Sequence, residues 1–263
     1  MMQSATSPRV AVVTGAARGI GLAIAGQFLE RGDAAVLLDI DAPTLADATA
    51  SLSARYGARV LGIPCDVSDP VQVTRSMTQA EQRFGRIDAL VNNAGVAVFK
   101  PLVDTTFEEW RYVMATNLDG TFLCSQACVP AMRRAGGGSI VNIASISGLR
   151  ASTLRVAYGT SKAALVHFTK QQAVELAMHG IRANAIAPGP VDTAMAKKVH
   201  SPAIRADYHA AVPLARYGSE EEIASGVLFL CSPQASYVTG QVLAVDGGFD
   251  AAGVGLTTLR EQG

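Results

Sequence analysis

Residues 14–21 read Thr-Gly-Ala-Ala-Arg-Gly-Ile-Gly and stand between an apolar run at 9–14 and a helical pattern at 20–31. Glycine tolerates positive φ and lets a phosphate approach the backbone, while the amino terminus of the following helix presents unpaired N–H groups and a partial positive charge. Many glycine-rich turns bind nothing, but a turn placed after the first strand of a βαβ unit is typical of dinucleotide binding. We therefore expect this turn to bind a dinucleotide through Gly15, Arg18, Gly19, Ile20 and Gly21.

Outward from this turn, short apolar runs rich in valine and isoleucine alternate with longer helical patterns. Parallel strands need crossovers of a dozen or more residues, and these crossovers are almost always right-handed. The alternation therefore predicts an α/β fold, a single-domain, doubly wound, Rossmann-type seven-stranded parallel sheet with helices on both faces. Strands are expected at 9–14, 34–39, 59–65, 89–92, 139–144, 181–187 and 242–245, and helices at 20–31, 43–56, after Pro70, at 107–134, 158–179 and 220–231.

We expect residues 1–263 to form one domain, with a flexible amino terminus at 1–8 and a tail at 250–263. Between 188 and 218 the periodicity is weak and prolines stand at 188, 190, 202 and 213. Because this segment follows the carboxyl end of a strand, where open α/β sheets bind ligands, we interpret it as a substrate lid. Its polar side chains can contact a polar substrate, but we interpret them as solvated loop residues, which are commoner: Lys197, Lys198, His200, Arg205 and His209.

The composition narrows the range of partners. Lysine plus arginine (22) balances aspartate plus glutamate (22), so no net charge attracts nucleic acid or an anionic membrane. No run of about 20 apolar residues can span a bilayer and residues 1–9 lack the apolar stretch of a signal peptide, so a cytoplasmic location is expected. The cysteines at 65, 124, 128 and 231 have no metal-ligand spacing, which predicts reduced structural thiols and no metal site.

Asp39 ends the second expected strand, 18 residues after Gly21, where an acid can accept hydrogen bonds from the adenosine ribose hydroxyls. A carboxylate there would repel a ribose 2′-phosphate, so Asp39 favours NAD over NADP. Arg18 points the other way, because a guanidinium in the phosphate turn can pair with a 2′-phosphate. Asp39 and Asp41 can also be read as turn residues that cap the helix beginning near Pro43.

Tyr158 and Lys162 stand four residues apart in a helical pattern, so both side chains lie on one face, one turn apart. The pKa of a phenol, about 10, must fall by about three units for proton transfer near neutral pH, which corresponds to roughly 4 kcal/mol. An ammonium about 5 Å away supplies roughly 3 kcal/mol at an effective dielectric of about 20, and a positively charged nicotinamide would add the rest. The pair is a candidate proton-transfer group, although Y-x-x-x-K also occurs as a plain surface pair.

Together with the glycine turn, four further features complete a pattern: Asn92-Asn93-Ala94-Gly95 after the fourth strand, Asn117 in the long helix, Ser145 after the fifth strand, and Tyr158 with Lys162. In this order and spacing, from about Arg9 to Phe249, the chain resembles the short-chain dehydrogenase/reductase family. The resemblance implies that the Ser145 hydroxyl holds the substrate oxygen and that Tyr158 exchanges a proton with it. It also implies that Lys162 binds the nicotinamide ribose and lowers the pKa of Tyr158, and that Asn117 anchors a water chain to solvent.

The resemblance also implies further cofactor contacts outside the glycine turn. Asp66-Val67 would meet the adenine, Pro188-Gly189 would lie beside the nicotinamide, and Thr193, two residues after Val191, would bind the carboxamide. Asp66 can equally cap a turn, and Pro188-Gly189 can simply end the strand. With these positions, the cofactor contacts expected beyond the turn are Asp39, Asp66, Val67, Asn93, Ala94, Gly95, Tyr158, Lys162, Pro188, Gly189, Val191 and Thr193.

These features predict an NAD-dependent oxidoreductase that interconverts a secondary alcohol, such as a polyol, sugar or cyclic alcohol, and its ketone. One alternative is an NADPH-dependent 3-oxoacyl-[acyl-carrier-protein] reductase, which shares the motifs but is disfavoured by Asp39. Another is a non-catalytic dinucleotide-binding protein, which would have no use for Ser145, Tyr158 and Lys162 together.

The helices expected at 107–134 and 158–179 carry more apolar surface than one sheet face can cover. Self-association would bury this surface, and the family resemblance implies a homotetramer in which these helices pack about a two-fold axis. On the first helix, the residues in question are Val113, Met114, Leu118, Phe122 and Leu123.

Overall fold

The computed structural model describes residues 8–253, and within them seven strands form one parallel sheet in the order β3-β2-β1-β4-β5-β6-β7. This confirms the predicted α/β, Rossmann-type fold class. Of the expected terminal segments at 1–8 and 250–263, residues 1–7 and 254–263 lie outside the described residues. The strands are β1 (Val10–Thr14), β2 (Ala34–Asp39), β3 (Val60–Pro64), β4 (Ala89–Asn92), β5 (Gly138–Ile143), β6 (Ile181–Pro188) and β7 (Val242–Val245).

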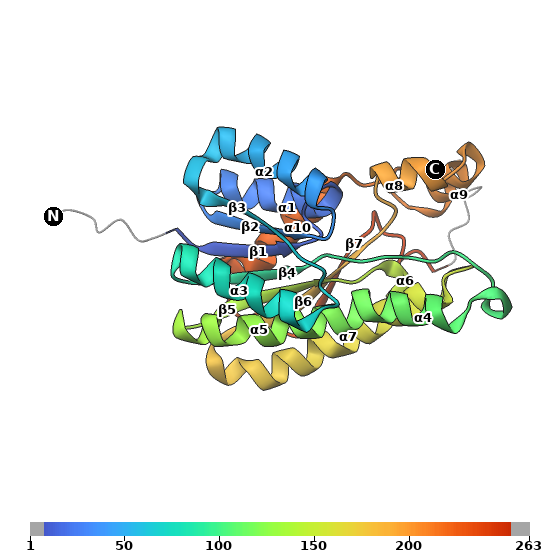
Figure 1. Ribbon diagram of the computed structural model, residues 1–263. Coiled ribbons are helices and arrows are strands. Elements are labelled where there is room, and N and C mark those ends of the chain that lie inside the picture. The colour runs from blue at the N-terminus through green and yellow to red at the C-terminus, as the bar shows by residue number, and fades with distance from the viewer. Residues whose placement is uncertain (1–7, 254–263) are drawn as a thin grey trace.

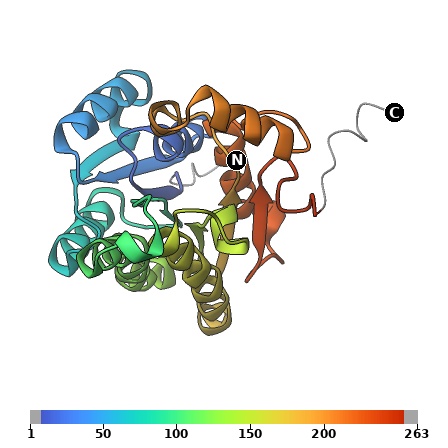
Figure 2. The ribbon, with the colours of Figure 1, turned by 90° about the vertical axis from the view of Figure 1, so that its right-hand side faces the viewer.

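The strand order reverses between β1 and β4, because β2 and β3 extend the sheet in one direction and β5 to β7 extend it in the other. The carboxyl ends of β1 and β4 lie side by side there, with Val12 in register with Leu90 and Val13 with Val91. Ligands of doubly wound sheets bind at such switch points, outside the carboxyl ends of the strands. Figure 2 looks onto this edge of the molecule.

Helices cover both faces of the sheet, as Figure 1 shows, with α1, α2 and α10 on one face and α3, α5 and α7 on the other. Because both faces are covered, β1 from Val10 to Val13 is apolar throughout and at most 1% exposed. The helices are α1 (Gly19–Glu30), α2 (Ala42–Tyr56), α3 (Pro70–Phe84), α4 (Phe107–Met114), α5 (Gly120–Arg134), α6 (Ile146–Leu149), α7 (Val156–Leu176), α8 (Ala194–Val199), α9 (Pro202–Ala211) and α10 (Glu220–Cys231).

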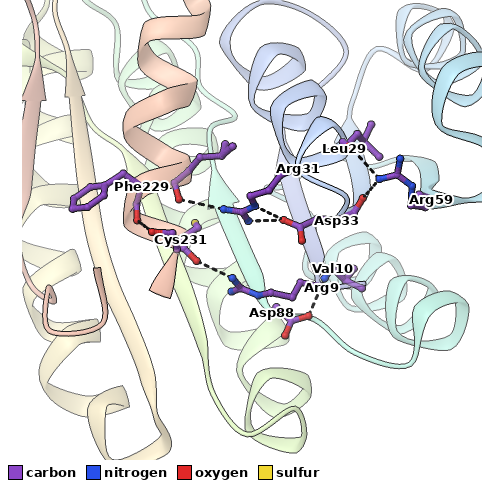
Figure 3. Close-up of polar contacts among 11 residues, drawn as sticks. Arg9, Val10, Leu29, Arg31, Asp33, Arg59, Asp88, Phe229 and Cys231 are labelled. Atoms are coloured by element: carbon purple, nitrogen blue, oxygen red, sulfur yellow. Dashed lines mark hydrogen bonds and ion pairs between the residues drawn. The ribbon is translucent and has the colours of Figure 1, made fainter. Parts of the chain in front are cut away.

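The amino edge of the sheet is closed by polar contacts within the chain (Figure 3). Arg31 pairs with Asp33 at 2.5 Å, and the Arg59 guanidinium donates to the carbonyl of Asp33 at 2.8 Å. The Asp88 carboxylate accepts from the backbone N–H of Val10 at 2.8 Å, which ties the strand β1 to the loop before β4. These contacts hold the ends of the strands and leave the opposite edge to the site.

The helix expected at 107–134 is not one regular α-helix, because a π-helical segment, η3 (Ala115–Asp119), separates α4 from α5. The segment contains Asn117, whose side chain bonds to neighbouring elements. Such π segments are frequent at functional sites. The difference cannot be read from hydrophobic spacing, which hardly distinguishes α from π geometry over five residues.

The lid segment at 188–218 is also more regular than its weak periodicity suggests, since it contains α8 and α9. Side chains cap both helices at their amino ends: Thr193 accepts from the N–H of Ala196, and Ser201 accepts from the N–H of Ile204. Pro202 stands in the first turn of α9, where its missing N–H is not needed. The segment therefore consists largely of two short capped helices.

Candidate active site

A cavity of about 630 Å³ opens at the carboxyl edge of the sheet, within the usual range for small-molecule sites. Of the predicted site residues, Gly21 and Asn117 do not line it. The cavity brings together all the others: Gly15, Arg18, Gly19, Ile20, Asp39, Asp66, Val67, Asn93, Ala94, Gly95, Ser145, Tyr158, Lys162, Pro188, Gly189, Val191 and Thr193.

The glycine turn has a backbone that only glycine adopts readily. Gly15 and Gly19 have φ values of +63° and +62°, and a Cβ on Gly21 would lie 2.1 Å from the carbonyl oxygen of Gly15. Within the described residues, no side chain caps the amino terminus of α1 and no acidic residue stands in its first turn. The unpaired N–H groups there fit a diphosphate, so this end of the cavity suits a dinucleotide.

Asn93 and Thr14 join the glycine turn to the end of β4. The Asn93 amide donates to the carbonyls of Thr14 and Gly15, both at 2.9 Å, and the Thr14 hydroxyl accepts from the N–H groups of Asn93 and Ala94, both at 3.0 Å. A Cβ on Gly15 would lie 2.9 Å from the Cα of Ala94. Asn93 therefore fixes the shape of the turn through its side chain.

Asp39 stands at the rim of the cavity, where its carboxylate accepts from the N–H groups of Ala17 and Asp41, both at 3.0 Å. Arg18 forms an ion pair with Asp41, and Asp41 also caps α2 by accepting from the N–H of Thr44 at 3.2 Å. The sequence-based reading of Asp41 as a helix cap is confirmed. The positive charge of Arg18 is thus directed toward α2.

Asp66 and Val67 follow β3 and line the same end of the cavity. The Asp66 carboxylate accepts from the N–H and the hydroxyl of Ser68, at 2.9 and 2.7 Å. This is the turn cap that the sequence left open as an alternative. Both residues face the cavity while Asp66 holds the turn.

At the other end of the cavity, α7 carries Tyr158 and Lys162. Lys162 is 3% exposed, its ammonium donates to the carbonyl of Ile143 at 2.7 Å, and it lies 5.7 Å from the centroid of the Tyr158 ring. Ser145, which follows β5, is 8% exposed, and its hydroxyl accepts from the N–H of Ser147 at 3.1 Å. Three groups of the expected catalytic set therefore share one buried wall.

The proton affinities at this wall differ from the sequence-based expectation. Burial raises the pKa of Tyr158 above its usual value, while hydrogen bonding to Ser145 and the positive charge of Arg155 oppose the rise. Burial lowers the pKa of Lys162 to about 8. The sequence predicts that Lys162 lowers the pKa of Tyr158, but within the described residues this lowering is not found. The Lys162 ammonium donates to the Ile143 carbonyl instead and is itself desolvated.

Asn117 is fully buried in η3, behind the cavity wall. Its side-chain oxygen accepts from the N–H of Val96 at 2.8 Å, and its amide donates to the Val96 carbonyl at 3.0 Å and to the Ser161 hydroxyl at 2.9 Å. A Cβ on Gly95 would lie 3.3 Å from the Asn117 oxygen and 3.4 Å from the Lys162 nitrogen. Asn117 thus holds the loop after β4 against α7, close to the lysine.

Between β6 and α8, the chain passes along the cavity from Pro188 to Thr193. Gly189 donates to the carbonyl of Val245 at 3.1 Å, and a Cβ on Gly189 would lie 2.6 Å from the Cα of Asp246. The Thr193 hydroxyl accepts from the N–H of Ala196 at 3.1 Å and so begins α8. The end of β6 and the start of α8 therefore meet at the side of the cavity where the nicotinamide is predicted to bind.

The cavity is also lined by polar side chains that the sequence analysis did not assign to the site, among them Arg155, Tyr208 and His200. The Arg155 guanidinium donates to the Tyr208 hydroxyl at 3.2 Å, and the His200 ring stacks on the Tyr208 ring with centroids 5.3 Å apart. The reading of His200 as a solvated loop residue is therefore wrong. Segment 188–218 turns His200 and Tyr208 toward the cavity, which its weak periodicity could not predict, whereas Arg155 precedes α7.

The four cysteines are free and buried, as expected of structural thiols. Burial raises the pKa of each, most strongly for Cys124 and Cys128, which makes the reactive thiolate rare. Across residues 8–253, no group of three or more histidine, cysteine, aspartate or glutamate side chains is arranged to hold a metal ion. Over the same residues, no helix has the length and apolar character needed to cross a membrane.

Comparison with known proteins gives matches over nearly the whole chain. The profile of a family described as enoyl-(acyl carrier protein) reductase matches residues 15–250. The chain is 39% identical to 2-(S)-hydroxypropyl-CoM dehydrogenase 3 of Xanthobacter autotrophicus, over 95% of this chain and 100% of the relative. It is 40% identical to the 3-oxoacyl-[acyl-carrier-protein] reductase FabG of Chlamydia muridarum, over 94% and 99% of the two chains.

Two further matches bear on substrate and structure. The chain is 41% identical to cis-4-hydroxycyclohexanecarboxylate dehydrogenase of Sinomonas cyclohexanicum, over 95% of this chain and 100% of the relative. Among solved structures, a short-chain type dehydrogenase/reductase from Mycobacterium ulcerans superposes with a TM-score of 0.89 at 32% identity, covering 92% of this chain and 90% of the other.

Proposed function

Because the chain belongs to the short-chain dehydrogenase/reductase family, we propose that it interconverts a secondary alcohol and its ketone, with NAD as the cofactor and Tyr158 as the proton-transfer group. The observation that carries this proposal is the placement of Ser145, Tyr158 and Lys162 on the wall of a cavity that also includes the glycine turn. A secondary alcohol, either a polyol, a sugar or a cyclic alcohol, suits the mixed polar and apolar walls.

The side chains divide the work of alcohol oxidation. The Ser145 hydroxyl positions the substrate oxygen, and Tyr158, once ionised, accepts the hydroxyl proton as the carbon–oxygen double bond forms. NAD, when bound, supplies the acceptor for the hydride that leaves the carbon. Lys162 places a cation 5.7 Å from the centroid of the Tyr158 ring and, as it lines the same cavity, would bind the nicotinamide ribose. Asn117 and Ser161 hold the loop and helix that carry these groups together.

Two observations support NAD over NADP. The Asp39 carboxylate stands at the rim of the cavity after β2, where it can accept from ribose hydroxyls and repels a 2′-phosphate. The Arg18 guanidinium, the group that could bind such a phosphate, is paired with Asp41. Both residues are held in these positions by the backbone of the turn and by α2.

The second candidate is an NADPH-dependent 3-oxoacyl-[acyl-carrier-protein] reductase, which the 40% identity to a FabG protein favours. It requires a different ribose contact from the one that Asp39 offers. A non-catalytic dinucleotide-binding role is the third candidate, and the buried placement of Ser145 and Lys162 disfavours it.

We also propose a homotetramer, but the apolar residues available for its interfaces differ from those that the sequence predicts. Of the five apolar residues named for the first helix, only Phe122 is strongly exposed, at 46%, whereas Val113 is fully buried within the chain. The exposed apolar side chains of these helices include Phe107, Tyr112 and Phe122 on the first, at 71%, 55% and 46%, and Val174 and Met178 near the end of α7, at 78% and 83%. A monomeric sedimentation coefficient at micromolar protein would contradict the assembly.

The test is a screen of NADH and NADPH absorbance. Wild-type protein is mixed with NAD or NADP and with sugars, polyols, cyclic alcohols, hydroxy acids and 3-hydroxyacyl thioesters, and Tyr158→Phe serves as the blank. We expect oxidation of a secondary alcohol with NAD. Activity confined to NADP and 3-hydroxyacyl thioesters, the reverse of 3-oxoacyl reduction with NADPH, would select the second candidate. Tight cofactor binding without turnover of any member would select the third.

A further inference from the structure

Arg155 differs from the other arginines whose contacts define the site and its surroundings. Arg18, Arg150 and Arg205 each pair with a carboxylate. Within residues 8–253, no carboxylate lies within 4 Å of Arg155, although the residue is half-buried and lines the cavity. A cation withdrawn from water without a counter-charge is costly, and a bound anion relieves that cost.

The surroundings of Arg155 orient its guanidinium and leave donors free. The guanidinium donates to the Ser147 hydroxyl at 3.3 Å and to the Tyr208 hydroxyl at 3.2 Å, and it lies over the Phe99 ring, 5.3 Å from the centroid. All three partners are neutral. Arginine has five N–H donors in a planar fork, and these two bonds leave enough of the fork to bind a carboxylate.

The backbone around Arg155 is held in place for this purpose. Arg155 is the N-cap residue of α7, three residues before Tyr158, and it forms a parallel bridge with Lys100. Leu154, immediately before it, adopts a φ of +60°, a left-handed conformation that is uncommon for a residue with a side chain. The Leu154 carbonyl accepts from the N–H of Lys100 at 3.1 Å.

We propose that Arg155 is a specificity-determining residue that binds a carboxylate on the substrate, so that the alcohol oxidised here is an anionic hydroxy acid. This inference rests on the proposed function. Lys162 and Arg155 stand on opposite sides of Tyr158 along α7, and the lysine is on the side of Gly95, in the loop after β4 that packs against the glycine turn. A substrate whose carbinol oxygen meets Tyr158 therefore extends its other end toward Arg155, away from the cofactor.

The charges that face Arg155 from the lid agree with this proposal. Arg205 and Lys197 both pair with Asp192, so the lid carboxylate nearest the cavity is already engaged. Burial and the charges of Arg155 and Arg205 lower the pKa of His200, which leaves this ring neutral and able to bond the Tyr217 hydroxyl at 3.0 Å. Among these groups, the cation without an anion is Arg155.

The experiment compares matched pairs of substrates that differ only in charge. Cis-4-hydroxycyclohexanecarboxylate and 3-hydroxybutyrate are each paired with their neutral carboxamides, and kcat/KM is measured with NAD for wild type, Arg155→Met and Arg155→Lys. A charge-assisted bidentate contact corresponds to roughly 10- to 100-fold in affinity. We expect wild type to prefer at least one acid over its amide by about this factor. Arg155→Met should lose the preference, and Arg155→Lys should keep part of it.

Arg150→Met is the matched control, since Arg150 is five residues away, pairs with Asp250 at the surface and does not line the cavity. Calorimetric titration of cyclohexanecarboxylate and cyclohexanecarboxamide into the NADH complex gives a readout that does not depend on turnover. Anion binding that is lost in Arg155→Met supports the inference even if no alcohol is oxidised, in which case the proposed function alone fails. Equal binding of acid and amide by wild type, or an equal loss of both in Arg155→Met, would overturn the inference.

Discussion

At the amino edge of the sheet, Arg31 and Arg86 each pair with a carboxylate two residues further on, whereas at the carboxyl edge Arg155 meets only hydroxyl groups and an aromatic ring. Figure 3 shows several of the contacts by which polar groups at the first edge pair within the chain. The second edge keeps one buried cation, Lys162, and one half-buried cation, Arg155, facing a cavity. The contrast indicates that one edge contributes to stability and the other is organised around ligands, as expected at the carboxyl ends of parallel strands.

The two halves of the cavity differ in a similar way. The cofactor half is formed largely by backbone, with Gly15 and Gly19 at positive φ. The substrate half is formed by side chains that reach in from α7 and from the lid, such as Tyr158, Arg155 and Tyr208. Backbone geometry leaves little room for variation, whereas side chains on a lid can change with the substrate. Variants can therefore separate the two edges and the two halves.

The largest expected effect comes from removing the Tyr158 hydroxyl. Tyr158→Phe should lower kcat for alcohol oxidation by about 10²- to 10⁴-fold, because general acid–base catalysis is worth about that much. The dissociation constant of NADH, measured by fluorescence titration, should stay within about threefold of wild type. Tyr237→Phe, at a fully exposed position, is the control and should keep full activity. Loss of NADH binding in Tyr158→Phe would mean that the two halves of the cavity are not separable.

The amino edge is tested by Asp88→Ala. Asp88 is 5% exposed, and its carboxylate accepts from the N–H of Val10 and pairs with Arg86 at 2.6 Å. Its removal leaves a buried N–H and a cation without partners, so the free energy of unfolding should fall by about 3 kcal/mol in denaturant titrations. The kcat of the folded variant should match wild type. Asp104→Ala, at an exposed position, should change neither quantity. A drop in kcat at unchanged stability would contradict the division between the edges.

Lys162→Met should stabilise the protein near neutral pH while removing activity. The folded-state pKa of about 8 is below the usual value of 10.5, so the unfolded chain binds the proton more tightly and burial of the charged lysine opposes folding below pH 8. The variant should gain about 2 kcal/mol near pH 7, after loss of the hydrogen bond to Ile143 is included. As the pH rises from about 8 to about 10, Lys162 in the wild type becomes neutral. The difference in the free energy of unfolding between variant and wild type should therefore narrow. Denaturant titrations across this range that show a constant gap would contradict a buried ammonium.

The smallest of these effects concerns cofactor choice. Asp39→Ala combined with Ile40→Arg removes the carboxylate at the rim and adds a cation at a neighbouring position that is 70% exposed and also lines the cavity. The ratio of kcat/KM for NAD to that for NADP should fall by about tenfold, in line with one charge-assisted contact. Asp47→Ala, which removes an exposed carboxylate on α2 that does not line the cavity, is the control and should leave the ratio unchanged. An unchanged ratio in the double variant would remove Asp39 as the determinant of preference.

Much of the fold could be predicted because parallel strands covered on both faces are uninterrupted apolar runs. The strands expected at 34–39, 89–92 and 242–245 are found at those residues. The π segment could not be predicted, since it depends on bonds from Asn117 to Val96 and Ser161, which are distant in sequence. The lid helices carried a readable signal, Ser201 before Pro202, which is a capping residue followed by a proline suited to the first turn.

The residues of the candidate site also differ in whether the sequence could predict them. Most residues set by motif spacing, such as Gly15, Ser145 and Lys162, line one cavity. Arg155 belongs to no motif, and its importance depends on the neutral partners that surround it, which only the folded chain reveals. The pKa of Tyr158 was also beyond sequence reasoning, because pair spacing gives the distance to Lys162 but not the desolvation of both groups.

The most direct test of Tyr158 as the proton-transfer group is a spectroscopic pH titration of phenolate absorbance, recorded for wild type and for Tyr158→Phe, with and without NAD. Burial raises the pKa of this phenol in the protein alone, so we expect it to ionise only at high pH there. When the absorbance of Tyr158→Phe is subtracted from that of wild type, the ionisation of Tyr158 remains. NAD should move this ionisation toward neutral pH, because the positive nicotinamide favours the phenolate. An ionisation that does not move with NAD, or that is still present in Tyr158→Phe, would contradict the assignment.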